Sequence, residues 1–270
     1  MVDTDVFLDL KKLKSRLQRP IPWTFRDEFN SINWGRYDNS HAPKSLGRLD
    51  HVRILQEGDG NSYISLTSKI GQLSNLNRGQ DRYIKDRVEL GLPPKIANFD
   101  LNNRLLWYGF QIKSKEKAFI PKAHSVTFTQ YKQIQKNSGR KKDCFPGMFW
   151  RMNAENNGKI WMAVTNEQGD KLNKKVMSSF ITDTWSDVII GVYFTTSDRG
   201  WLKAYVNDRL VYSYSGRTVM NQFKSCKPKY FENYLRIGVY RGSDTKKLGT
   251  QKLDKNQSDT LHFDNFVVSD

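Results

Sequence analysis

Three short segments of the chain carry side chains that can bind an acidic substrate and remove a proton from it. In the first, RVELG (residues 87–91), Arg87 and Glu89 share one face of an expected strand, because successive strand side chains point to opposite faces. A guanidinium held by a neighbouring carboxylate is a rigid fork for a substrate carboxylate or sulfate. Taken alone, this segment is more typical of an exposed ion pair worth about 0–1 kcal/mol.

The second segment is TFTQYKQ (residues 127–133), where Gln130 and Lys132 share a strand face. A glutamine amide can donate to a carboxylate and accept from a hydroxyl. Lysine supplies a point charge or, if desolvated, a base. Taken alone, this pattern is also typical of an ordinary polar surface strand.

The third segment is YLRIGVYRG (residues 234–242), where three aliphatic residues alternate with Tyr234, Arg236, Gly238 and Tyr240. Alternation of this kind predicts a half-buried strand. A solvated strand face more usually carries Lys, Glu, Thr or Ser, so a face of two phenols and a guanidinium suggests a binding edge. If the three segments lie in one sheet, they line a single groove.

The elements that would position these residues are short strands separated by turns rich in Asn, Asp and Gly. At least ten such strands, with no helical pattern between them, predict an all-β fold, a two-sheet antiparallel β-sandwich of the concanavalin-like jelly-roll type. We expect residues 1–22 to form a short amphipathic helical segment and residues 23–270 a single jelly-roll domain. A lysine-rich insertion over residues 136–147 is expected to be a loop beside the site.

The charge of the chain points to a polyanionic partner. Lys and Arg total 44 against 28 acidic residues, a net charge of +16 with a pI near 9.7. Nucleic acid, acidic polysaccharide and anionic membrane are all compatible with this excess. Nucleic acid ranks last because no zinc spacing or helix-turn-helix pattern occurs, and no run of 18 apolar residues could span a membrane. We expect a monomer.

Metal and disulfide signals are weak. EGDGN (residues 57–61) and Asp264 could build a structural calcium site from oxygen ligands, although a plain turn is the better interpretation. The two cysteines and four histidines have no zinc-ligand spacing. Whether Cys144 and Cys226 pair stays open.

In order, RVEL, QYK and YLRIGVY resemble the motifs of the jelly-roll polysaccharide lyases, a group that includes alginate lyases, glucuronan lyase and heparin lyase I. The pattern of that group runs R-x-E-L, then Q-x-H or Q-W-H, then Y-x-K-x-G-x-Y. The resemblance covers residues 24–270. It implies cleavage of an anionic, uronic-acid-containing polysaccharide by β-elimination, with no cofactor required.

The resemblance also implies roles for individual residues. Arg87 and Gln130 would bind the uronate carboxylate, Arg236 would hold substrate, and Tyr240 falls on the catalytic tyrosine. The remaining expected substrate ligands are Tyr234, Glu89 and Arg151. Two positions depart from the pattern: Lys132 stands where many members have histidine, and Gly91 stands where alginate lyases have a second arginine.

β-Elimination needs a neutralised carboxylate, a base at C5–H and an acid at the leaving oxygen. A phenol, with a usual pKa of about 10, needs neighbouring cations to ionise near neutral pH. Our hypothesis is that Tyr240 removes the proton and returns one to the glycosidic oxygen, a syn elimination, while Gly238 makes room for a sugar ring. Lys132 would stabilise the phenolate or act as base itself, and His51 is the alternative base.

Two other functions fit the same fold. One is a glycoside hydrolase, favoured by TFRDEFNSINW (residues 24–34) but not by the missing E-x-D-x-E strand signature. The other is a non-catalytic module that binds acidic glycans. The polymer, and internal or terminal cleavage, stay open. A polysaccharide substrate implies action outside cells, whereas the N-terminus shows no apolar signal core; a processed form or a virus- or phage-borne enzyme would reconcile the two.

Overall fold

The computed structural model describes residues 25–27, 51–69, 87–91, 103–122, 125–136, 149–165, 171–219, 230–242 and 257–269. The expected segment over residues 1–22, almost all of the insertion at 136–147 and both cysteines lie outside these ranges. The predicted division at residue 22 therefore stays a prediction.

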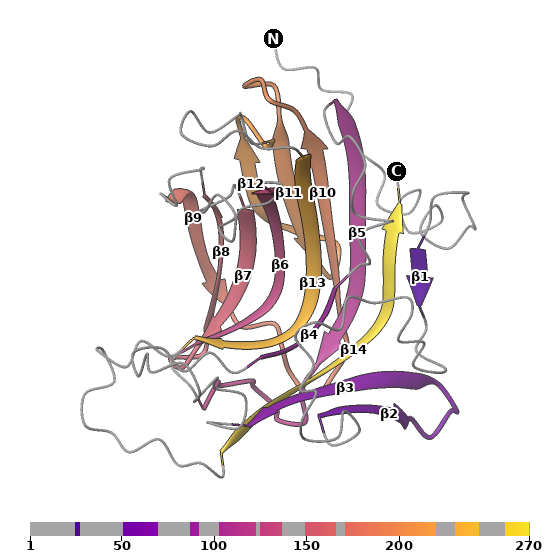
Figure 1. Cartoon of the computed structure of the whole chain (residues 1–270). Coiled ribbons are helices and arrows are strands. Elements are labelled where there is room, and N and C mark those ends of the chain that lie inside the picture. The colour runs from indigo at the N-terminus through magenta and orange to yellow at the C-terminus, as the bar shows by residue number, and fades with distance from the viewer. Residues whose placement is uncertain are drawn as a thin grey trace, which may run out of the picture.

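The described residues form fourteen strands in two antiparallel sheets, which confirms the all-β sandwich (Figure 1). The strands are β1 (Phe25–Asp27), β2 (Val52–Gln56), β3 (Ser62–Lys69), β4 (Arg87–Gly91), β5 (Arg104–Lys113), β6 (Ser125–Lys136), β7 (Phe149–Glu155), β8 (Lys159–Thr165), β9 (Lys171–Ser178), β10 (Ser186–Phe194), β11 (Trp201–Val206), β12 (Arg209–Ser215), β13 (Tyr230–Gly242) and β14 (Ser258–Ser269). In these parts of the chain, no helix has the length and apolar character needed to cross a membrane.

The two sheets have different sizes and face each other. The larger runs β12-β11-β10-β5-β14-β3-β2, with β1 paired to β14, and the smaller runs β4-β13-β6-β7-β8-β9. Strands β13, β6, β7 and β8 lie side by side and bend in the same direction, with β10, β11 and β12 behind them (Figure 1). The three segments singled out in the sequence are therefore neighbouring strands of the smaller sheet.

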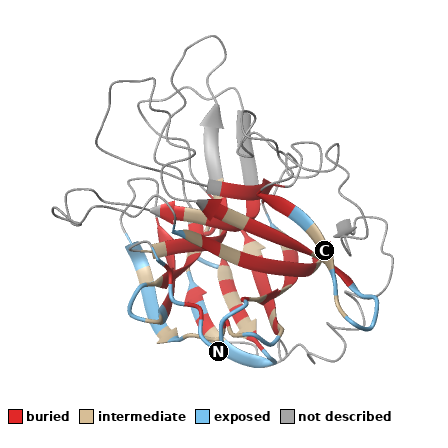
Figure 2. Cartoon of the chain, turned by 90° about the horizontal axis from the view of Figure 1, so that it is seen from below, coloured by how far each residue is buried: buried red, intermediate tan, exposed pale blue. Residues whose placement is uncertain are grey.

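The core lies between the sheets and follows from the period-two alternation of apolar residues. Figure 2 shows buried residues running along the strands and exposed residues in the turns. On the smaller sheet, Val88, Leu90 and Ile237 are fully buried against the larger one. Because these residues take the inner face, their polar neighbours on the same strands must take the outer face.

Strand β9 is one that the sequence pattern does not predict. Its residues are mostly exposed, including Leu172 and Val176, so no alternation of buried apolar residues marks it. It forms the edge of the smaller sheet beside β8. Lysine side chains on an edge strand hinder its pairing with other chains.

An ion pair joins the two sheets inside the sandwich. Arg241 of β13 places its Nε 2.8 Å from Oδ2 of Asp259 in β14, and the side chains are only 3% and 1% exposed. The backbone N–H of Lys122 also donates to Asp259, at 2.8 Å. A carboxylate buried this deeply needs such partners, since an uncompensated charge in the core is strongly destabilising.

Candidate active site

Strand register brings the three polar segments together on the outer face of the smaller sheet. Strand β13 lies between β4 and β6, with Tyr240 opposite Arg87 and Arg236 opposite Gln130. The Arg87 and Tyr234 side chains lie outside the described residues, so only their strand positions are known. The strands that carry the three segments are therefore neighbours in one sheet, as expected.

One buried carboxylate holds two of the expected substrate ligands. The Gln130 Nε2 amide donates to Glu89 Oε1 at 2.5 Å, and Arg236 Nη1 lies 3.6 Å from Glu89 Oε2. Glu89 is 2% exposed. The sequence analysis predicted Glu89 as a partner of Arg87 and as a substrate ligand, and both stay predictions. Its burial and its two contacts add a role in holding Gln130 and Arg236 in place.

Gly238 makes this arrangement sterically feasible. It pairs with Glu89 across β4 and β13, and the Glu89 side chain crosses β13 to reach Gln130 on the far side. A Cβ atom at Gly238 would lie 2.3 Å from the Val88 carbonyl oxygen and 3.2 Å from Glu89 Cγ, and its φ of +151° also favours glycine. The space beside Gly238 is thus occupied by the backbone of β4 and by the Glu89 side chain.

Arg151, on β7, is a cation that interacts with Tyr240. Tyr240 is half-buried, and its phenol interacts electrostatically with the Arg151 guanidinium. Burial lowers the pKa of Arg151, and the interaction with Tyr240 acts in the opposite direction. The guanidinium carbon also lies 5.0 Å from the ring centroid of Trp161 on β8. A desolvated guanidinium beside a phenol can stabilise negative charge on the oxygen.

Lys132 lies farther from Tyr240 than the sequence suggested. In the register it faces Tyr234, six residues before Tyr240 on β13, or about 20 Å along the strand. The stabilisation of a phenolate by Lys132 stays a prediction, and Arg151 is a second cation that interacts with Tyr240. Strand alternation alone could not show this, because it does not determine which residues of β6 and β7 lie opposite each other.

The alternative base, His51, lies at the larger sheet, whereas Tyr240 lies on the smaller one. It precedes β2 on the larger sheet, is 2% exposed, and its Nδ1 lies 3.0 Å from the Thr67 carbonyl oxygen. His51 is therefore a structural residue that ties β2 to β3.

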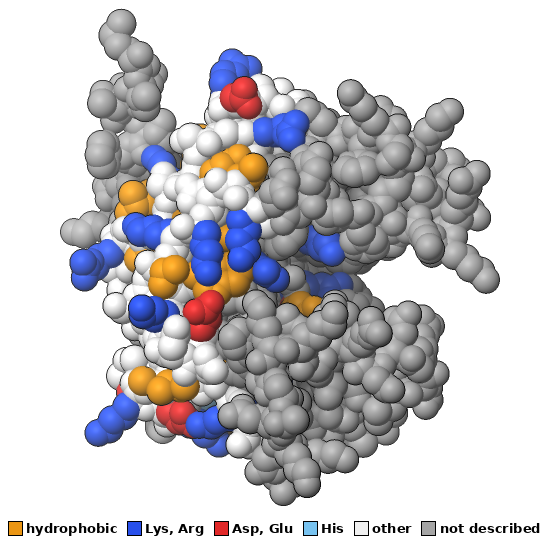
Figure 3. Space-filling view, turned by 90° about the vertical axis from the view of Figure 1, so that its left-hand side faces the viewer, with side chains coloured by type: hydrophobic (Ala, Val, Ile, Leu, Met, Phe, Trp, Pro, Cys, Tyr) orange, Lys and Arg blue, Asp and Glu red, His pale blue; other side chains and the backbone are white. Residues whose placement is uncertain are grey.

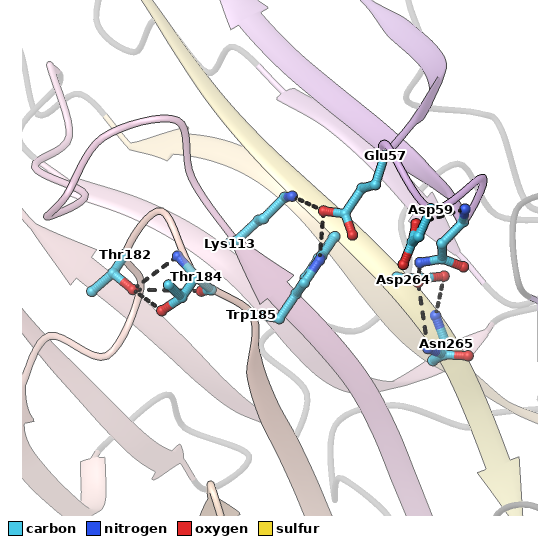
Figure 4. A network of polar contacts seen from close by, with 9 residues as sticks. Glu57, Asp59, Lys113, Thr182, Thr184, Trp185, Asp264 and Asn265 are labelled. Atoms are coloured by element: carbon cyan, nitrogen blue, oxygen red, sulfur yellow. Dashed lines mark hydrogen bonds and ion pairs between the residues drawn. The ribbon is translucent and has the colours of Figure 1, made fainter.

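Some of the residues suggested as calcium ligands do lie close together, where they are joined by hydrogen bonds (Figure 4). Asn61 Nδ2 donates to Asp264 Oδ2 at 2.9 Å, and the Asn265 N–H donates to Asp264 Oδ1 at 2.7 Å. Glu57 turns away and pairs with Lys113 and with the Trp185 indole N–H. Among the described residues, no three His, Cys, Asp or Glu side chains are grouped to hold a metal ion, and calcium binding stays a prediction.

Comparison with known proteins identifies the family of the chain and solved structures with a similar fold. The family model described as polysaccharide lyase matches residues 24–267. No curated protein matches the chain in sequence.

Two solved structures resemble the sandwich at low sequence identity. The endo-β-1,4-glucuronan lyase from the fungus Trichoderma reesei has a TM-score of 0.54 at 15% identity, covering 86% of this chain and 94% of that one. The alginate lyase Aly36B with a bound alginate tetrasaccharide has a TM-score of 0.50 at 10% identity, covering 92% and 97%. At these identities the likeness is one of fold.

Proposed function

The chain belongs to the polysaccharide lyase family, and from this premise we propose that it cleaves a uronic-acid-containing anionic polysaccharide by β-elimination. One observation carries the proposal: the candidate binding and catalytic residues share the outer face of the smaller sheet. There Glu89 holds Gln130 and Arg236, and Tyr240 interacts electrostatically with Arg151. Carboxylate-binding groups and an acid–base group therefore share a surface.

Binding of the uronate carboxylate comes first. Gln130 and Arg236, with Arg87 on the adjacent strand, would donate to the carboxylate and neutralise it. Neutralisation makes the C5 proton more acidic, because the enolate-like charge that forms on deprotonation is spread onto the same oxygens. Because these donors are already in position, they need no reorganisation when the negative charge forms.

Proton transfer then falls to Tyr240. Its ionised oxygen would take the C5 proton, the electron pair would form the C4–C5 double bond, and the C4–O bond would break. The departing glycosidic oxygen would take the proton back from the Tyr240 hydroxyl. Arg151 would stabilise the phenolate, and no cofactor is required for these steps.

A screen of the purified protein against polyglucuronate, alginate and a heparin-like chain tests the proposal. The expected result is rising ultraviolet absorbance from the unsaturated product with at least one polymer and none with a neutral glucan. New reducing ends without absorbance would indicate a glycoside hydrolase. Binding without either signal would indicate a non-catalytic glycan-binding module.

A second prediction concerns Glu89. Glu89→Gln keeps an acceptor for Gln130 but removes the charge opposite Arg236, so we expect kcat/KM to fall about 10-fold, largely through KM. Steady-state kinetics on the selected polymer measure the change. The matched control is Asp183→Asn, which removes the same charge at an exposed position and should leave kcat/KM near wild type. Equal kinetic constants for the two variants would show that Glu89 does not position the ligands.

A further inference from the structure

The outer face of the larger sheet carries two aromatic rings with a lysine between them, on the side of the sandwich away from Tyr240. On β11, Trp201, Lys203 and Tyr205 are half-buried and point outward, while the residues between them lie in the core. We call these three residues the β11 row. Alternate residues of a strand lie about 6.7 Å apart, so the Cα atoms of the two aromatic residues are about 13 Å apart.

The two rings of the β11 row rest on a buried apolar floor. Trp107 of β5 and Ile189 of β10 are 4% and 5% exposed, and Trp201 and Tyr205 pack against them. Trp107 can lie flat on β10 because Gly191 has no side chain, since a Cβ atom there would lie 2.4 Å from its ring. The ring centroids of Trp107 and Trp201 are 6.0 Å apart, with an angle of 57° between the planes. A ring held in this way loses little freedom when a ligand binds.

Lys203 carries a charge that no neighbouring carboxylate balances. Its Nζ lies 5.5 Å from the ring centroid of Trp201, and no carboxylate among the described residues forms an ion pair with it. The outward acid of the neighbouring strand β10 is Asp187, which accepts a hydrogen bond from Gln111 Nε2 at 2.9 Å. It lies four residues, or about 13 Å, from Gly191, the residue opposite Lys203. The face therefore attracts an anion to its centre.

Strand β12 leaves the β11 row open on its other side. The residues opposite Lys203 and Trp201 are Ser213 and Ser215, both exposed. These side chains are short and uncharged, and their hydroxyls can donate to or accept from a ligand. Seen from the side of β9, the described surface shows more Lys and Arg than Asp and Glu side chains (Figure 3). An anionic ligand is thus favoured over a cationic one.

The chemistry of the β11 row fits an acidic sugar. A sugar ring can pack its apolar C–H face on an aromatic ring while its hydroxyls stay in water, and a uronate unit adds a carboxylate for Lys203. The two aromatic residues are separated by a length that a short oligosaccharide spans. Nucleic-acid bases also stack on aromatic rings, but a strand of phosphates favours several cations, whereas the row offers one.

We propose that the larger sheet holds a second glycan-binding site, where Trp201 and Tyr205 stack on sugar rings and Lys203 binds a uronate carboxylate. The two outer faces of the sandwich point in opposite directions, so this site holds one stretch of polymer while the smaller sheet acts on another. Attachment of this kind raises the local concentration of polymer at the enzyme. The inference does not depend on the proposed cleavage, because none of the residues proposed for cleavage takes part in this binding.

Nuclear magnetic resonance of the full-length protein carrying Tyr240→Phe tests the site without cleavage. The indole N–H signal of Trp201 is assigned by its loss in Trp201→Phe and followed during titration with a glucuronate trisaccharide. We expect a saturable shift, with the affinity about three-fold weaker in Lys203→Gln and weaker at high salt. The matched control is Lys117→Gln, which removes an exposed charge beyond the end of β5 and should leave this affinity unchanged. A neutral glucose trisaccharide should shift the signal far less.

The outcomes separate this inference from the proposed function. An unmoved Trp201 signal, or equal affinities in Lys203→Gln and Lys117→Gln, overturns the second site even if lyase product forms. A signal that moves with protein concentration alone, together with a dimer in sedimentation, assigns the face to contact between two copies and overturns it too. Equal affinity for an oligonucleotide of the same charge overturns the choice of a sugar. Saturable binding that depends on Lys203, without lyase product from any polymer, supports the second site and refutes the proposed function instead.

Discussion

Replacing Tyr240 with phenylalanine is expected to lower kcat on the selected uronate polymer by about 10³-fold. The phenol is proposed to serve as both base and acid, and each role is worth about 10²–10⁴-fold when a positioned group supplies it. Formation of the unsaturated product, followed by ultraviolet absorbance, measures the loss. Binding should change far less, because Gln130, Arg236 and their holder Glu89 are untouched.

The matched control is Tyr193→Phe on β10 of the larger sheet. It removes the same hydroxyl from a half-buried tyrosine that lies away from the proposed site, so kcat should stay near wild type. A Tyr240→Phe enzyme that keeps most of its turnover would assign the proton transfer to another group and refute the mechanism, although not the lyase family.

The second large effect concerns the ion pair inside the sandwich. Asp259→Leu leaves the Arg241 guanidinium buried without its carboxylate and removes the acceptor for the Lys122 N–H, so the free energy of unfolding should fall by about 3–5 kcal/mol. Urea unfolding followed by tryptophan fluorescence measures this loss. The physical cause is desolvation: a charge that cannot reach water requires its partner.

Two further variants make this prediction specific. Removing both charges with Arg241→Met and Asp259→Leu should restore much of the stability, because neither charge of this pair is then left buried without the other. Glu116→Ala breaks the exposed pair with Lys122, separated by 3.3 Å, and should cost at most about 1 kcal/mol. An Asp259→Leu protein as stable as the Glu116→Ala protein would contradict the view that the buried pair matters to the sandwich.

Much of the fold could be predicted from local patterns. The alternation in YLRIGVYRG requires one apolar and one polar face, and it correctly separates Ile237, which is in the core, from Arg236 and Tyr240 on the outer face. The order of the motifs also indicated the polysaccharide lyase family, which the family model confirms. Period-two patterns suffice for this because they depend only on neighbours along one strand.

Cross-strand partners depended on the tertiary structure. Glu89 was expected to pair with Arg87 along its own strand, and the structure adds contacts across Gly238 to Gln130 on β6 and to Arg236 on β13. Likewise, Lys132 was the expected cation for Tyr240; the register places Lys132 opposite Tyr234, and the structure adds an electrostatic interaction between Tyr240 and Arg151. Strand β9 escaped prediction because its Lys-rich edge buries too little to leave a pattern.

By itself, the sequence therefore determined which side chains share a strand face and which family they belong to. Only the tertiary structure decided which of those faces meet and which carboxylate holds which cation. The reason is physical: side-chain direction along a strand follows from local backbone geometry, whereas pairing and register are set by packing between residues far apart in the chain.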